Sequence, residues 1–76
     1  MTEVLLLDTK GLKCPLPVLK ARRALKDVPP GGLMRVLATD PGAEQDFRHF
    51  CKTTGCRLVE STVSDGVYVF TLEKPA

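Results

Sequence analysis

Residues Gly11–Val18 read GLKCPLPV and place a cysteine directly ahead of two closely spaced prolines. Proline suits the first turn of a helix, because the backbone N–H that it lacks would have no intrahelical partner there. We therefore expect a helix to begin at about Pro15, with Cys14 at its N-cap or beside it. Unpaired N–H groups and the positive dipole end at a helix start both favour a thiolate. The stretch thus predicts a reactive Cys14 thiol with a lowered pKa.

The residues around this cysteine favour a carrier of sulfur species over a redox dithiol. Lys13 adds positive charge next to Cys14, and Pro17 stands where a Cys-x-x-Cys site would have its second cysteine. In such sites the second thiol resolves the bond that the first one forms. A sulfur species bound to Cys14 would therefore persist until another molecule accepted it. The alternative is that Cys14 only caps the helix and that the prolines only stiffen its start.

This stretch, preceded by Leu7-Asp8, resembles the Cys-Pro-x-Pro signature of the TusA/SirA-like sulfur carrier family. The resemblance extends to Lys20–Arg23, to Asp40-Pro41 and to Asp65-Gly66, so it covers nearly the whole chain. It implies a sulfurtransferase that accepts sulfane sulfur as a persulfide on Cys14 and passes it to a cysteine of a partner protein. The residues expected to support the helix start are Lys13, Pro15 and Pro17.

The resemblance also implies partners. The sulfur donor would be a cysteine desulfurase or a rhodanese-like protein, and the relay would serve tRNA thiolation, molybdenum-cofactor assembly or sulfur oxidation. No small cofactor is implied. Arg22 and Arg23 match basic positions of the family motif, and they form either a docking surface for acidic partners or a solvated helix face. Asp40, expected first as a helix cap, and Asp46 lie on or near the second helix, where they are candidates for partner contact.

Length and composition indicate one small domain over residues 1–76. No apolar run approaches the ~20 residues of a membrane span, and the run at Val4–Leu7 is too short for a signal-peptide core. The odd number of cysteines, three, agrees with a reducing compartment. A net charge of +2, one tyrosine and no tryptophan argue against nucleic acid. We expect a cytoplasmic monomer without membrane contact.

Hydrophobic patterning predicts the element order β-α-β-α-β-β. The expected elements are a short buried strand at Glu3–Asp8, a helix from Pro15 to Lys26, an inner strand at Leu33–Thr39, a helix that begins at Asp40-Pro41 and stops at Gly55, and strands at Arg57–Ser64 and Val67–Glu73 joined by an Asp65-Gly66 hairpin turn. This order predicts an α+β fold, a two-layer sandwich with both helices on one face of a four-stranded mixed sheet. The family resemblance implies the strand order 1-2-4-3.

Within the first helix, Val18, Ala21 and Leu25 recur on one face, and Leu19 and Ala24 widen this stripe toward the core.

Two further cysteines lie in the second half of the chain. Cys51 falls on the apolar stripe of the second helix and is expected to be a small buried side chain. Cys56 follows Gly55 and is expected to be partly exposed. The spacing of His49, Cys51 and Cys56 is not a recognised zinc pattern, so we expect no metal.

Two rival classes of function remain at this point. One is a regulatory or structural binding module, and the other is a thiol-redox or selenium-handling protein that uses Cys14 with Cys56 or with a partner thiol. Loading with a persulfide donor separates the first rival from a carrier, and a mixed disulfide formed without sulfur transfer would favour the second.

Overall fold

The computed structural model describes residues 4–76, and its elements follow the expected order β-α-β-α-β-β. Glu3, the expected first residue of the N-terminal strand, lies outside the described residues. Within residues 4–76, no helix has the length and apolar character needed to cross a bilayer. The elements are β1 Val4–Asp8, α1 Leu16–Ala24, a short 3-10 turn η1 Leu25–Asp27, β2 Leu33–Ala38, α2 Ala43–Thr54, β3 Arg57–Ser64 and β4 Val67–Glu73.

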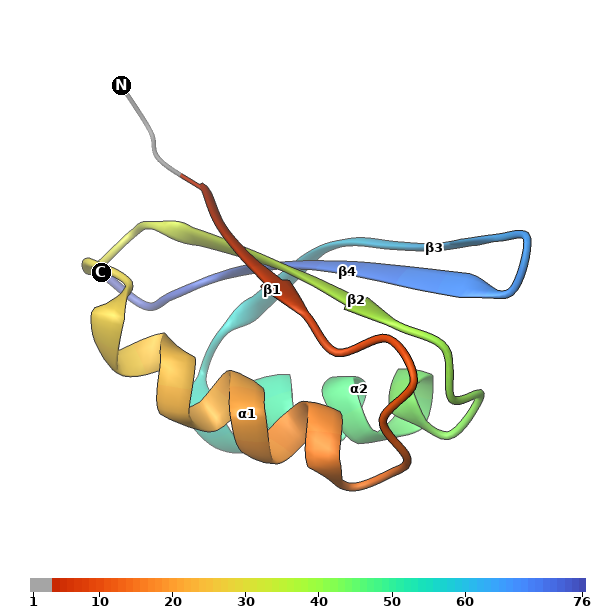
Figure 1. Cartoon of the computed structure of the whole chain (residues 1–76). Coiled ribbons are helices and arrows are strands. Elements are labelled where there is room, and N and C mark those ends of the chain that lie inside the picture. The colour runs from red at the N-terminus through yellow and green to blue at the C-terminus, as the bar shows by residue number, and fades with distance from the viewer. Residues whose placement is uncertain (1–3) are drawn as a thin grey trace.

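The strands form one four-stranded mixed sheet in the order β1-β2-β4-β3. β1 and β2 are parallel and are joined by α1, whereas β4 is antiparallel to both of its neighbours. Both helices cover one face of the sheet and leave the other face open (Figure 1). The predicted α+β two-layer sandwich with strand order 1-2-4-3 is confirmed.

The predicted hairpin between β3 and β4 is also present. Asp65 has φ 51° and Gly66 has φ 78°. Two consecutive central residues with positive φ give a turn whose twist matches that of the flanking strands. This turn sets the register of β3 against β4.

Aromatic side chains join the helix layer to the sheet. Phe47 of α2 stacks on Phe70 of β4, with ring centroids 4.8 Å apart, and Phe50 meets Phe47 edge-on at 6.1 Å. Val36 lies opposite Phe70 in the β2–β4 register, and both side chains are fully buried. β2 lies between β1 and β4 and is therefore an inner strand, as expected from its apolar character on both faces apart from Arg35.

Both helices begin later than expected. α1 begins at Leu16 with Pro15 as its N-cap. α2 begins at Ala43 with Gly42 as its N-cap, so the prediction that Asp40 caps this helix is wrong. A turn over Pro41 and Gly42 separates Asp40 from the first helical residue, Ala43. The Asp40 carbonyl instead accepts the Ala43 N–H at 3.0 Å, and its Oδ1 accepts the Gly42 N–H at 3.1 Å.

The structure corrects three expectations about burial. β1, expected to be buried, is largely exposed: Leu6 is 61% exposed, although Leu7 packs against the core. Leu19, expected on the core stripe of the first helix, is 52% exposed. Cys56, expected to be partly exposed, is buried, as is Cys51. Each difference depends on which element lies opposite the residue, and the local pattern does not contain that information.

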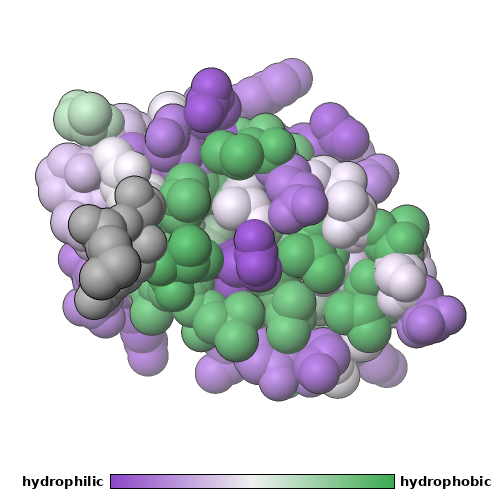
Figure 2. All heavy atoms as spheres, turned by 90° about the horizontal axis from the view of Figure 1, so that it is seen from above, coloured by the Kyte–Doolittle hydropathy of each residue, from purple (hydrophilic) through white to green (hydrophobic). Residues whose placement is uncertain are grey.

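The open face of the sheet carries apolar side chains around polar ones (Figure 2). Arg35 of β2 donates from Nε to Oγ1 of Thr71 on β4 at 3.2 Å, and its guanidinium lies 3.8 Å from the carboxylate of Glu60 on β3. The Thr71 hydroxyl donates to the same carboxylate at 3.2 Å. This polar network links three neighbouring strands across the open face.

Candidate functional site

Cys14 lies in the loop that joins β1 to α1, next to the loop that joins β2 to α2 (Figure 1). Hydrogen bonds hold the first loop against the end of β2 and against the loop that follows it. The Thr9 N–H donates to the Leu37 carbonyl at 2.8 Å, and the Gly11 N–H donates to Oγ1 of Thr39 at 2.9 Å. Because β1 and β2 are parallel, their C-terminal ends lie side by side, and both loops start from there. The parallel β1-α1-β2 unit thus places the thiol beside the start of the second helix.

Asp40 anchors the backbone of Cys14. Its Oδ2 accepts the Cys14 N–H at 2.5 Å, while Oδ1 accepts the Gly42 N–H. The hydrogen bond from the Cys14 amide, then that from Gly42, and also the charge of Lys13 hold the pKa of Asp40 below its usual value. Asp40 is therefore an ionised carboxylate that binds the backbone on both sides of the site.

The Cys14 thiol donates a hydrogen bond from Sγ to Oδ2 of Asp46, in the first turn of α2. This bond raises the pKa of the Cys14 thiol, and partial desolvation and the negative charges of Asp46 and Asp40 act in the same direction. The expectation of a lowered pKa is therefore wrong. A carboxylate that accepts a hydrogen bond from a thiol favours the protonated thiol. This effect outweighs that of the positive dipole end of α1, which begins two residues after Cys14.

Gly42 contributes to the site, and the sequence reasoning did not identify it. A methyl group built at Gly42 would lie 3.6 Å from Cβ and 3.8 Å from Sγ of Cys14. These are van der Waals distances, so Gly42 borders the thiol directly and leaves open the space that a methyl group would fill. The signal was present in the sequence as an Asp-Pro-Gly turn ahead of the second helix.

A shallow hollow of about 320 Å³ lies beside the thiol. It is lined by Gly11, Leu12, Lys13, Thr39, Asp40 and Pro41. Lys13, expected to support the helix start, thus contributes to this surface next to Cys14. Of the expected prolines, Pro15 is the N-cap of α1 and the side chain of Pro17 is buried. The peptide bond between Cys14 and Pro15 is cis.

The two arginines expected to act together lie on different sides of α1. The Arg22 guanidinium lies 5.2 Å from the centre of the Phe50 ring on α2, in cation–π contact. Arg23 instead lines a groove of about 480 Å³ between β1 and α1. Asp40 and Asp46, considered as residues for partner contact, both lie against Cys14.

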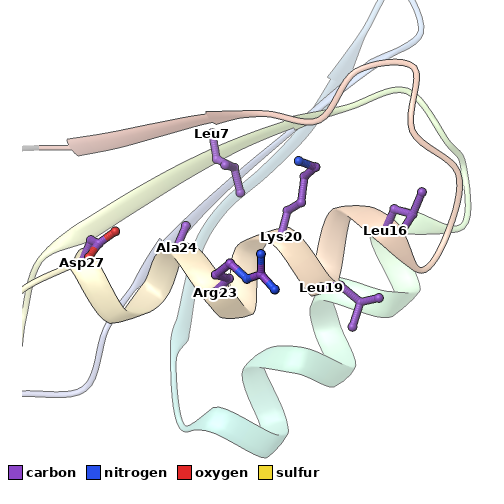
Figure 3. A pocket seen from close by; sticks show the side chains of 7 residues that line it. All are labelled: Leu7, Leu16, Leu19, Lys20, Arg23, Ala24 and Asp27. Atoms are coloured by element: carbon purple, nitrogen blue, oxygen red, sulfur yellow. The ribbon is translucent and has the colours of Figure 1, made fainter.

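The lining of this groove between β1 and α1 includes Leu16, which follows Cys14 by two residues in the sequence (Figure 3). Its apolar part includes Leu16, which is 46% exposed, and its middle carries the side chains of Lys20 and Arg23. In residues 4–76 neither of these two cations makes a salt bridge. The full lining is Leu7, Leu16, Leu19, Lys20, Arg23, Ala24 and Asp27.

All three cysteines are free, and Cys14 alone among them is exposed. Burial, with a smaller effect of Cys56, raises the pKa of the Cys51 thiol to about 11. Residues 4–76 contain no group of three or more His, Cys, Asp or Glu side chains placed to hold a metal ion. The thiol chemistry available at neutral pH is therefore concentrated at Cys14.

Comparison with known proteins places this arrangement in a family. Residues 6–74 match the family described as Sulfurtransferase TusA. The chain is 44% identical to the sulfur carrier protein TusA of Allochromatium vinosum, over 90% of each chain. It is 41% identical to the TusA protein of Pseudomonas aeruginosa, over 93% of this chain and 90% of that one.

A solved structure gives the same result for the fold. The SirA-like protein from Desulfitobacterium hafniense superposes with a TM-score of 0.82 at 25% sequence identity, over 97% of this chain and 100% of that one. The match covers both helices and the sheet that together hold Cys14, Asp40 and Asp46. The sequence match over residues 6–74 and the shared fold lead to one conclusion: this chain belongs to the TusA family.

Proposed function

We propose that this protein is a sulfur carrier that holds sulfane sulfur as a persulfide on Cys14 and acts as a sulfurtransferase within a relay. The observation that carries the proposal is the exposed Cys14 thiol, held in place through its backbone by Asp40, in a chain whose other cysteines are buried. Membership of the TusA family, and the sulfur carriers among the relatives, support the same activity.

The transfer step balances without an external oxidant or reductant. Cys14 sulfur attacks the outer sulfur of a donor persulfide, R–S–SH. A new S–S bond forms at Cys14, the S–S bond of the donor breaks, and the electron pair leaves on the inner sulfur of the donor. The proton lost from Cys14 is matched by the proton gained by R–S⁻, which leaves as R–SH. Delivery repeats the step with a partner cysteine as the attacking thiol.

The buried second thiol argues against an intramolecular redox function. A dithiol mechanism needs a resolving thiol that can reach the first sulfur, and Cys56 is buried in the core cluster. The other rival, a binding module in which Cys14 carries nothing, predicts no sulfur uptake. Measurement of loading therefore separates this rival from the carrier.

The relay needs a sulfur donor, for which we propose a cysteine desulfurase or a rhodanese-like protein, and an acceptor protein with a reactive cysteine. Free thiols persist in a reducing compartment, so we propose that the relay runs in the cytoplasm. For docking, Lys20 and Arg23 of the β1–α1 groove are cations that complement an acidic partner surface.

The test is intact-mass measurement after incubation with glutathione persulfide or with a cysteine desulfurase and cysteine. We expect the wild type to gain the mass of one sulfur atom and Cys14→Ser to gain none. Cys14→Ser retains Cys51 and Cys56, so it controls for sulfur bound elsewhere. Absence of loading in the wild type, or loading and delivery by Cys14→Ser, would overturn the proposal.

A further inference from the structure

Two carboxylates lie against Cys14, and their surroundings give them different roles. Both oxygens of Asp40 already accept backbone N–H groups, from Cys14 and from Gly42. Oδ2 of Asp46 accepts a hydrogen bond from the Cys14 thiol, and in the described part of the chain the Asp46 carboxylate accepts no other hydrogen bond. Of the two acids, Asp46 is the one that contacts the reacting sulfur and retains free acceptor capacity.

The position of Asp46 is set by its element. It lies in the first turn of α2, half-buried, and its N–H donates to the Gly42 carbonyl at 3.2 Å. Gly42 is also the residue that closely approaches Cys14. A carboxylate held by a helix turn at hydrogen-bond contact with a nucleophile has the geometry required of a catalytic base.

The nucleophile in sulfur transfer is a thiolate, so the proton that Cys14 carries must leave before or during the attack. The charged groups near the sulfur are Asp46 and Asp40, together with Lys13, whose charge acts on Asp40. Because the two acids raise the pKa of the Cys14 thiol, this thiol is mostly protonated at neutral pH in the unloaded carrier. Loading at neutral pH therefore needs an acceptor for that proton.

We propose that Asp46 is a catalytic residue: its carboxylate takes the proton from Cys14 as the sulfur attacks, and then returns it to the departing donor thiolate. In this step, which rests on the proposed carrier function, the Asp46 carboxylate gains H⁺ from Sγ while the Cys14–S bond to the outer donor sulfur forms. The donor S–S bond breaks, and R–S⁻ takes the proton from the Asp46 carboxyl group and leaves as R–SH. The carboxylate is regenerated, and no electrons are exchanged with an outside reagent.

The test uses Asp46→Asn, which has nearly the same shape but accepts no proton, and two rates measured on the same protein. The first is the pH profile of Cys14 alkylation by iodoacetamide, which needs only a thiolate. The second is the rate of loading from glutathione persulfide at neutral pH, followed by intact mass. Circular dichroism checks that each variant is folded.

We expect the two rates to move in opposite directions in Asp46→Asn. Without the carboxylate the pKa of Cys14 falls, so the alkylation profile shifts to lower pH and alkylation at neutral pH becomes faster. Loading becomes slower, by about 100-fold, the lower end of the usual contribution of a positioned base. A role of Asp46 in the fold alone would not separate the two rates.

Two matched variants complete the test. Asp46→Glu keeps a carboxylate and should recover part of the loading rate. Glu44→Gln removes an exposed acid from the same first turn of α2 that makes no hydrogen bond to Cys14, and it should leave both rates close to those of the wild type. Loading of Asp46→Asn as fast as wild type, or equal losses in Glu44→Gln and Asp46→Asn, would overturn the role of Asp46. A wild type that fails to load would instead overturn the carrier function itself.

Discussion

At the scale of single residues, the site depends on how closely two segments approach each other. The Cys14 amide N–H is bound by Asp40 and the Cys14 thiol by Asp46, so two polar groups of this residue are held by the α2 side of the site. A methyl group at residue 42 would lie in van der Waals contact with Cβ and Sγ of Cys14. Sulfur chemistry at Cys14 should therefore be sensitive to the size of residue 42.

Gly42→Ala should separate stability from sulfur loading. Gly42 has φ −68°, which alanine adopts without strain, so the free energy of unfolding should be unchanged or higher by about 0.4–1 kcal/mol. The added methyl group would occupy space 3.8 Å from Sγ of Cys14 and should slow loading by roughly tenfold. Urea unfolding and intact-mass kinetics measure the two effects. Equal loading rates in the variant and wild type would show that the donor does not approach from this side.

At the scale of elements, α1 presents two different surfaces. One side packs through Arg22 toward Phe50 of α2, and the other borders β1 and carries Lys20 and Arg23 (Figure 3). β1 is at the edge of the sheet and contains neither lysine nor proline, residues that commonly protect such edges. The other edge strand, β3, has an irregular register between Leu58 and Glu60. The β1–α1 edge is thus the more accessible of the two for a partner protein.

Charge reversal in the groove should slow transfer to or from an acidic partner. In Lys20→Glu/Arg23→Glu the association rate should fall at low salt, because steering by these cations is lost. The difference from wild type should diminish near physiological ionic strength, where the Debye length is about 8 Å. Transfer rates measured over a salt series test this expectation.

The matched control for this prediction is Lys26→Glu, which changes an exposed charge outside the lining of the groove. A salt-independent defect in the double variant, or an equal defect in Lys26→Glu, would show that the groove does not dock the partner. Arg22 is left unchanged in both variants because its loss would also remove the contact with Phe50.

At the scale of the whole molecule, stability depends on the contact between the helix layer and the sheet. A chain of 76 residues has a free energy of unfolding of about 4–11 kcal/mol on the usual scale per residue. The stack of Phe47 on Phe70 is the aromatic contact that joins α2 to the sheet, and both rings are fully buried. The site depends on the same packing, because α2 carries Asp46.

Phe47→Ala should cost about 3–5 kcal/mol in the free energy of unfolding, a large share of the total. We expect a strongly lowered urea midpoint and, with it, loss of the hydrogen-bonded site. Phe47→Leu keeps most of the buried volume and should cost less. A midpoint in Phe47→Ala close to that of wild type would show that other contacts hold the two layers together.

The sequence alone determined the order of the elements and the two-layer architecture, because these depend on local signals, whereas the strand order was an implication of the family resemblance. Alternation in the strands, prolines near the helix starts, Gly55 with φ 78° at the end of α2 and the Asp65-Gly66 turn all act within a few residues. The same local reasoning identified Cys14 as the cysteine directly ahead of a helix. It did not predict that β1 is an exposed edge or that Cys56 is buried.

The tertiary structure decided the chemistry of the thiol. Asp40 and Asp46 lie 26 and 32 residues beyond Cys14 in the chain, yet they bind its amide and its sulfur. A helix dipole can be anticipated from the local sequence, whereas a carboxylate delivered by another helix cannot. Because a pKa depends on the charges and hydrogen bonds nearest in space, the direction of its shift at Cys14 followed from how α1 and α2 pack and not from the residues adjacent in sequence.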